Sequence, residues 1–133
     1  MELSEQLRQA LLTYGAIEKE VSTVGLRQGG EAKQELVRAR RDISEQIGVL
    51  GLLIEQDECL ARAPDRQLEL SRLFAAMRYA LALHQASWPV VRIDEDLAAY
   101  RDSARDAQTK SETFWRWCRA QLGVDNRQVV SES

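Results

Sequence analysis

The residues best able to support chemistry in this chain are a single histidine, His84, and two cysteines, Cys59 and Cys118. Carboxylate-bridged metal sites in helical proteins use a Glu-x-x-His motif on two helices, and that motif is absent. A zinc site or a thiolate nucleophile would need a cysteine near the histidine, but the topology predicted below separates them. We therefore expect no catalytic residue, no metal ligand and no cofactor, and the interpretation leans against an enzyme.

Two local patterns suggest binding of phosphate or DNA, and neither is complete. The pair Gly29-Gly30 precedes a predicted helix but lacks the Lys-Ser/Thr of a phosphate-binding loop. Residues 43–49 resemble the first helix and turn of a helix-turn-helix motif, but the positions that would face the groove offer little to phosphates or base edges. These positions are Gly51, Leu52, Glu55 and Gln56. Because the formal net charge is −3, we expect no nucleic-acid partner.

Length and composition indicate one globular domain. The chain has 133 residues, of which 44% are hydrophobic and 29% charged, a balance that supports a core without a metal or a disulfide. No apolar stretch reaches the length of a membrane span, and the first residues lack the order of a signal peptide. We expect a cytoplasmic protein with free thiols and no membrane partner.

Four segments with helical periodicity must position these residues. Apolar residues recur at spacings of three and four through residues 2–24, 31–62, 64–86 and 94–122, with Asp94 as the expected N-cap of the last. Since short connections make successive helices antiparallel neighbours, the sequence predicts an all-α fold, an antiparallel up-down four-helix bundle with long second and fourth helices. Residues 1–123 form the domain in this interpretation, and residues 124–133 form a flexible tail.

The most unusual segment is residues 48–54, which are apolar on all sides of a predicted helix. Such a helix has to be covered on every side, by the chain or by a second copy of it. Our first hypothesis is therefore a non-enzymatic protein-interaction or regulatory module that acts as a homodimer. The partner in this hypothesis can also be another protein, with the chain acting as an adaptor, a secretion-type chaperone or a regulatory subunit, and the sequence leaves all three roles open. The expected contact residues are Val49, Leu52, Leu53, Trp115 and Trp117.

The alternative hypothesis is a small-molecule-binding or enzymatic bundle. Ala104, Ala107 and Ser111 lie in the middle of the last apolar stripe, where small side chains either let helices approach or leave room for a ligand. Close packing is the default, because protein interiors seldom keep voids. The end of the bundle that holds His84 is a second possible location of the pocket, although a structural role of His84 is favoured over a metal-binding role. The expected lining residues are His84, Trp88, Tyr100 and Ser111.

Overall fold

The computed structural model describes residues 3–27 and 29–127, and within these ranges the chain is helical and has no strand. This confirms the all-α prediction. The elements are α1 (Glu5–Gly25), α2 (Gly30–Gln56), α3 (Glu58–Ala61), α4 (Pro64–Ser87), the 3₁₀ helix η1 (Val90–Glu95) and α5 (Leu97–Leu122). None of the described helices combines the length and the apolar character that crossing a bilayer requires.

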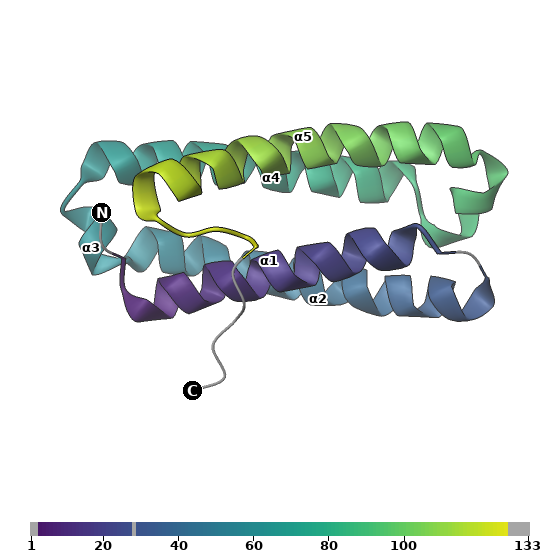
Figure 1. Cartoon of the computed structure of the whole chain (residues 1–133), viewed down its shortest axis with the longest axis horizontal. Coiled ribbons are helices and arrows are strands. Elements are labelled where there is room, and N and C mark those ends of the chain that lie inside the picture. Colours follow the sequence, from purple (N-terminus) through teal and green to yellow (C-terminus); the bar gives the residue numbers. More distant parts are fainter. Residues whose placement is uncertain (1–2, 28, 128–133) are drawn as a thin grey trace.

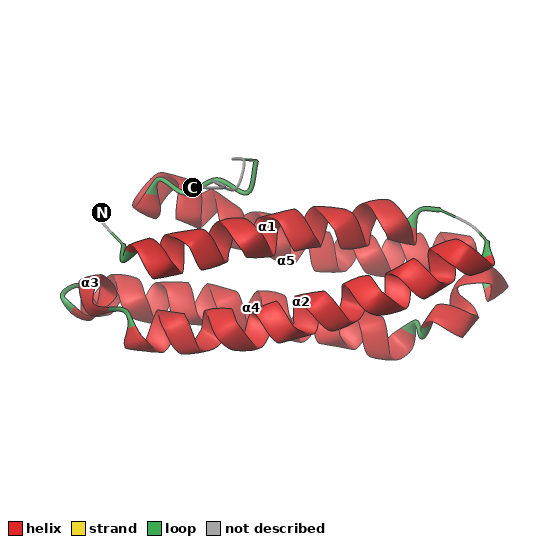
Figure 2. Ribbon diagram, turned by 90° about the horizontal axis from the view of Figure 1, so that it is seen from below, coloured by secondary structure: helices red, strands yellow, loops and turns green. Residues whose placement is uncertain are grey.

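The four long helices lie side by side as two pairs, α1 with α2 and α4 with α5 (Figure 1). α2 and α4 also pack on each other and join the two pairs. On the remaining side, α1 and α5 do not approach each other as closely, although they run next to each other (Figure 2). The backbones of α1 and α5 are therefore farther apart than those of the other neighbouring helices.

Two apolar clusters hold the helices together. The larger cluster draws on all four long helices and includes Leu7, Leu11, Leu50, Phe74 and Trp115. The smaller cluster lies where α1 connects to α2 and α4 connects to α5, and it consists of Val24, Leu36, Trp88, Ile93 and Tyr100. Since burial of one large apolar side chain contributes about 1.5–3 kcal/mol, the larger cluster dominates the stability of the fold.

The apolar run at 48–54 lies within α2, which continues through both of its glycines. Leu50 and Ile54 point inward and are buried, and Leu53 is half-buried against the core. Val49 and Leu52 are 47% and 57% exposed, because the helical period of 3.6 residues turns them away from the core. The described part of the chain thus covers the run on one side only, and Val49 and Leu52 lie on the outer side of α2.

The prediction of one helix through residues 31–62 is wrong in its last part, because α2 ends at a buried carboxylate, Asp57. The Oδ2 atom of Asp57 accepts a hydrogen bond from the backbone N–H of Leu60 at 3.0 Å and thereby caps α3. Its Oδ1 atom accepts hydrogen bonds from the backbone N–H and the hydroxyl of Ser4. Ser4 in turn caps α1 by accepting from Leu7 N–H, so one carboxylate fixes two helix starts.

The last long helix begins later than predicted. Residues 90–95 form η1, and the N-cap of α5 is Asp96, whose Oδ1 accepts from the N–H of Ala99 at 3.0 Å. Asp94, the expected cap, belongs to η1 and pairs with Lys33 of α2. The 3₁₀ turns place Ile93 in the smaller cluster, which explains why the helix cannot start before them.

The chain folds back after α5 (Figure 1). Gly123 ends the helix with a positive φ of 66°, and Val124 re-enters the core, where it is fully buried. Asn126 then lies so close to Gly15 of α1 that a Cβ on this glycine would be 3.2 Å from it. Val124 is therefore part of the packed domain and not of a free tail, since its side chain fills the larger cluster. Residues 128–133 of the predicted tail lie outside the described residues.

Gly48 offers a test of the exposed face of α2. A Cβ added there meets no atom within 4 Å, so alanine should gain its helix propensity without a clash. We expect Gly48→Ala to raise the free energy of unfolding by about 0.5–1 kcal/mol in urea denaturation at low protein concentration. In Gly51→Ala the added Cβ would meet the Phe74 ring at 3.4 Å, an ordinary van der Waals contact, so the two gains should be similar if helix propensity is their cause. A loss of stability in Gly48→Ala would contradict the claim that a Cβ at this position meets no other atom.

Candidate functional site

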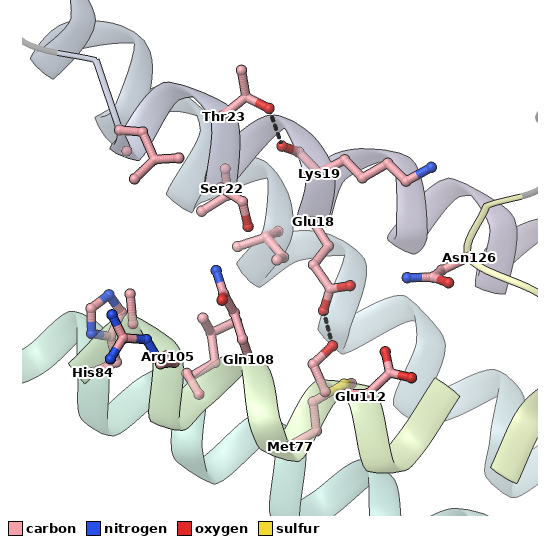
Figure 3. A pocket seen from close by; sticks show the side chains of 18 of the residues that line it. Glu18, Lys19, Ser22, Thr23, Met77, His84, Arg105, Gln108, Glu112 and Asn126 are labelled. Atoms are coloured by element: carbon pink, nitrogen blue, oxygen red, sulfur yellow. Dashed lines mark hydrogen bonds between the residues drawn. The ribbon is translucent and has the colours of Figure 1, made fainter. Parts of the chain in front are cut away.

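A cavity of about 620 Å³ lies between α1 and α5, with side chains of α2 and α4 as its floor (Figure 3). Its volume falls within the range of ordinary ligand pockets. The apolar part of the lining includes Val21, Ile43, Met77, Leu81, Ala104 and Ala107. The polar part includes Glu18, Ser22, His84, Gln108, Ser111 and Asn126. An apolar body with polar groups at separate points is the usual form of a small-molecule site.

Small side chains on α5 keep this cavity open. Ala104, Ala107 and Ser111 follow each other along the face of α5 that looks toward α1, and all three are half-buried. Larger residues at these positions would fill the space between the two helices. The alternative hypothesis placed a pocket at this layer, and the structure has a cavity there.

The carboxylate of Glu18 is the centre of the polar contacts in the cavity. It accepts hydrogen bonds from Trp115 Nε1 at 3.0 Å, from the Tyr14 hydroxyl at 3.3 Å and from the Ser111 hydroxyl. These donors come from α1 itself and from α5, so the carboxylate joins the two helices whose backbones stand apart. All three donors are uncharged groups. Among the described residues, no lysine, arginine or histidine lies within ion-pair distance of Glu18.

Burial sets the ionisation of this group of residues. Loss of water around the carboxyl raises the pKa of Glu18, and the nearby charge of Glu112 adds to this, whereas the three hydrogen bonds act in the opposite direction. Burial, together with the charge of Glu18, also raises the pKa of Tyr14 above its ordinary value. Tyr14 is therefore a neutral hydroxyl at physiological pH and serves as a donor.

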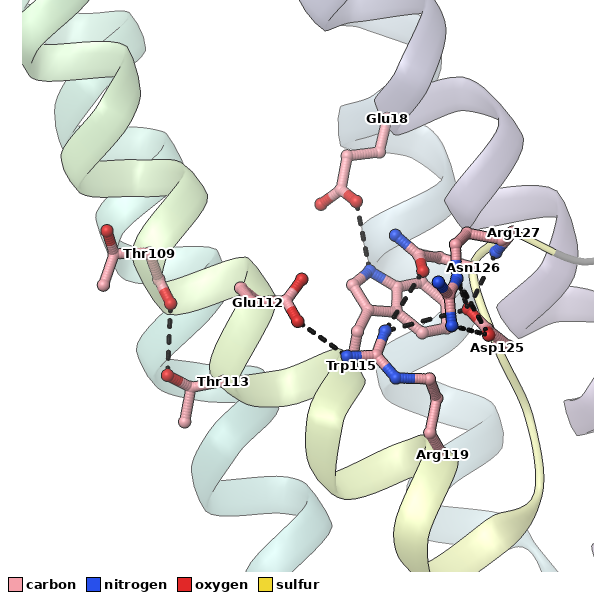
Figure 4. A network of polar contacts seen from close by, with 9 residues as sticks. All are labelled: Glu18, Thr109, Glu112, Thr113, Trp115, Arg119, Asp125, Asn126 and Arg127. Atoms are coloured by element: carbon pink, nitrogen blue, oxygen red, sulfur yellow. Dashed lines mark hydrogen bonds and ion pairs between the residues drawn. The ribbon is translucent and has the colours of Figure 1, made fainter.

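The outer edge of the cavity carries charged side chains of both signs. Lys19, Arg101 and Arg105 are exposed there, and Arg105 pairs with Asp102 at 3.2 Å. Figure 3 shows the Lys19 ammonium extending away from the Glu18 carboxylate. Glu112 is held by Arg119 at 2.6 Å, and Arg119 also reaches the Asn126 side chain at 3.5 Å (Figure 4). Exposed charges of this kind are screened by water and salt, unlike the carboxylate inside.

His84 lies at the other end of the cavity from Glu18 (Figure 3). Its Nδ1 atom is 2.7 Å from the Ser103 hydroxyl, and its ring packs on Tyr100 with centroids 5.4 Å apart. Burial and the charge of Arg40 lower the pKa of His84 to about 4, which makes the ring a weak base at neutral pH. Ser103 lies within α5, whose backbone N–H groups bond within the helix. The contact therefore serves to satisfy a buried ring.

The structure brings together three of the four expected pocket residues. His84, Tyr100 and Ser111 line the cavity. Trp88 does not, because it belongs to the smaller cluster, with its ring edge on Tyr100 and the Arg92 guanidinium 4.8 Å from its ring centroid. The decisive residue, Glu18, was not predicted. Its signal in the sequence is a carboxylate four residues after Tyr14, at the edge of an apolar stripe.

The expected contact residues have different environments. Val49 and Leu52 are exposed on α2, and Trp117 is half-buried against the core. Trp115 is fully buried, so its expected role on a partner surface is wrong for this conformation. Its indole stacks on Tyr14 and donates to Glu18, and these contacts with α1 account for its buried position.

Neither cysteine takes part in the cavity, and burial raises the pKa of the Cys118 thiol to about 12. Within residues 3–27 and 29–127, no three His, Cys, Asp or Glu side chains come together as a metal site. In comparisons with known proteins, the chain matches no family model, no curated sequence and no solved structure.

The low pKa of His84 predicts an acid-sensitive fold. Between its ordinary value of 6.5 and about 4, the unfolded chain binds a proton that the folded chain excludes, so stability falls as the pH falls through this window. After allowance for partial solvation, we expect this ring to account for a loss of about 2 kcal/mol. Urea denaturation near pH 7.5 and pH 4.5 should show a smaller loss in His84→Gln than in the wild type. Equal losses would assign the acid sensitivity to other groups.

Glu18 predicts a pH dependence of the opposite sign. Its pKa is raised in the folded chain, so the folded state binds more protons than the unfolded state above the ordinary glutamate value, and stability falls as the pH rises. In Glu18→Gln the amide oxygen can still accept from Trp115, and the amide nitrogen can donate to the two hydroxyls. We expect the stability of Glu18→Gln relative to the wild type to increase from about pH 5 to about pH 8. A difference that does not change with pH would contradict the raised pKa.

Proposed function

We propose that this protein binds a small organic molecule in the cavity between α1 and α5. The observation that carries this proposal is the cavity of about 620 Å³, which combines an apolar wall with a hydrogen-bonded carboxylate inside it. The layer of Ala104, Ala107 and Ser111 is half-buried and the space beside it opens to solvent, which gives a ligand access to the apolar wall. The proposal is for binding, because the hydrogen bonds from Tyr14, Ser111 and Trp115 hold the Glu18 carboxylate at a fixed place in the cavity.

The scaffold we propose for this function is the antiparallel up-down four-helix bundle. Its support is the order of packing, in which α1 meets α2, α2 meets α4 and α4 meets α5. The cavity then occupies the fourth side, where the first and last helices face each other. Ligand sites in bundles are commonly built from side chains on facing helices.

A blocked-cavity variant tests this proposal. Thermal-shift screening of the wild type against a panel of small metabolites should find compounds that raise the melting temperature, because a ligand at 100 times its Kd adds about 2.7 kcal/mol. Ala107→Phe fills the layer between the helices and should abolish these shifts. The matched control, Ala120→Phe, changes an exposed alanine of the same helix outside the lining and should keep them. A flat response of the wild type, or shifts that persist in Ala107→Phe, would contradict the proposal.

A second candidate function is protein interaction as a homodimer, favoured by an apolar outer face on α2 and α4. Val49 and Leu52 of α2 are exposed, as are Tyr79 and Leu83 of α4. A shallow hollow between the two helices, lined by Gly51, Ala75, Tyr79 and Ala82, lies beside them. Exposed apolar residues on neighbouring helices are typical of interfaces, and a twofold dimer would cover them with a copy of the same face.

The dimer can be tested independently of the cavity. We expect size-exclusion chromatography with light scattering to give a dimer mass at micromolar concentration and a monomer mass for Leu52→Glu. Val91→Glu is the matched control, because Val91 is an exposed apolar residue of η1 away from this face. A wild-type protein that is monomeric at these concentrations would count directly against the second candidate.

A further inference from the structure

The carboxylate of Glu18 faces the cavity and is largely removed from water, and within residues 3–27 and 29–127 it has no cationic partner. Its Oε2 atom accepts from Tyr14 and Ser111, and its Oε1 atom accepts from Trp115, the one donor to this oxygen in the described part of the chain. A carboxylate oxygen can accept two hydrogen bonds, so Oε1 keeps one acceptor position. A charge that has lost its water is costly unless an opposite charge lies nearby or further donors form hydrogen bonds with it.

We propose that the ligand of this cavity is an organic cation, an ammonium group on an apolar body, with the Glu18 carboxylate as its counter-ion. This inference depends on the proposed binding function and names the chemical class of the ligand. The ammonium donates to Oε1 of Glu18, and the apolar body lies along α5. Hydrogen bonds between ionised groups are about twice as strong as those between neutral groups, which gives the carboxylate control over selectivity.

The lining of the cavity suits such a body. Beyond Glu18, the wall continues with Val21, Leu81, Ala104 and Ala107, none of which carries a charge. Met77, whose sulfur lies 3.6 Å from the Tyr14 hydroxyl, adds a polarisable surface beneath them. The donors around Glu18 are fixed by helices on both sides, so the carboxylate needs no rearrangement to receive the ligand.

An anionic ligand is disfavoured by the same arrangement. The cationic side chains of the lining, Lys19, Arg101 and Arg105, are exposed at the edge. Lys19 extends away from the carboxylate (Figure 3), and Arg105 is paired with Asp102. Inside the cavity an anion would meet the Glu18 carboxylate, whereas Glu112 at the edge is paired with Arg119.

Three probes of similar shape and different charge test this inference: hexylammonium, hexan-1-ol and hexanoate. Isothermal titration of the wild type should give hexylammonium an affinity about tenfold higher than that of hexanol, as expected for one charge-assisted contact in a partly buried site. In Glu18→Gln the affinities of hexylammonium and hexanol should become about equal, because neither probe then meets an ionised acceptor. Glu20→Gln removes the same charge from an exposed position of α1 outside the lining and should keep the full preference. Melting temperatures of both variants confirm that they are folded.

The outcomes separate this inference from the proposed function. If hexanol and hexylammonium bind equally well to the wild type, or if hexanoate binds best, the cavity binds ligands but the choice of a cation is overturned. If Glu18→Gln loses hexanol as well, Glu18 shapes the cavity and does not select charge, which also overturns the inference. If none of the three probes binds to the wild type, both the inference and the proposed binding function fail.

Discussion

Replacement of Trp115 by alanine should lower the free energy of unfolding by about 3–5 kcal/mol, the range for truncation of a large buried aromatic. Trp115 is fully buried, and its ring centroid lies 6.2 Å from that of Tyr14 and 5.2 Å from that of Phe114. Its Nε1 atom donates to Glu18 on α1. The substitution thus removes packing and one of the contacts that hold α5 to α1. Chemical denaturation should show a lower midpoint with an unchanged slope.

Two further variants make this result specific. Trp115→Phe keeps most of the packing but removes the indole N–H, and should cost about 1–2 kcal/mol because Glu18 loses a donor. Trp117→Ala serves as the control, since Trp117 is only half-buried at the border of the same cluster. If Trp115→Ala costs no more than Trp117→Ala, Trp115 does not occupy the interior position described above.

Asp57→Ala should cost about 2–3 kcal/mol, because the change removes a helix cap and leaves buried donors without an acceptor. The affected donors are the N–H of Leu60 and the N–H and hydroxyl of Ser4. Asp57 is 4% exposed, so water cannot replace the carboxylate easily. Thermal or urea unfolding monitored by circular dichroism measures this loss.

Neighbouring variants identify the cause. Glu58→Ala changes an exposed acidic residue of the same turn and should be close to neutral. Asp57→Asn keeps one acceptor oxygen and should fall between Asp57→Ala and the wild type. A double-mutant cycle of Asp57→Ala with Ser4→Ala should be non-additive, since the two side chains share one contact. Additive losses would show that the two caps act separately.

Much of the fold could be predicted from the sequence, because the apolar stripes of the long helices are regular and glycine or proline separates most of them. The two wrong helix boundaries lie where a polar residue interrupts an apolar stripe that continues beyond it. Ala61, seven residues after Ile54, keeps the inward period of α2 across Asp57, so periodicity alone does not show the break that buries Leu60 in its place. At the start of α5, Asp94 and Asp96 give equivalent cap signals, and the choice depends on how Ile93 packs in the smaller cluster.

The site could be predicted only in part. The layer of Ala104, Ala107 and Ser111 is visible in the sequence because small residues recur on one stripe. Glu18 was missed because an acid at the edge of a stripe normally faces water. Its inward position depends on Ser111 and Trp115, which are more than ninety residues away in the sequence. Trp115 was assigned to the surface for the same reason, since its partners come from the other end of the chain.

The burial of Val124 in the core links the structure to biosynthesis. Until residues 97–126 have left the ribosome, α1 has neither Trp115 against Tyr14 nor Asn126 against Gly15. The nascent chain can form the local hairpin of α1 with α2 first, whereas the contacts of α1 with α5 form only after α5 and the segment that follows it have emerged. A truncation before Val124 would consequently leave this final step of assembly without one of its core side chains.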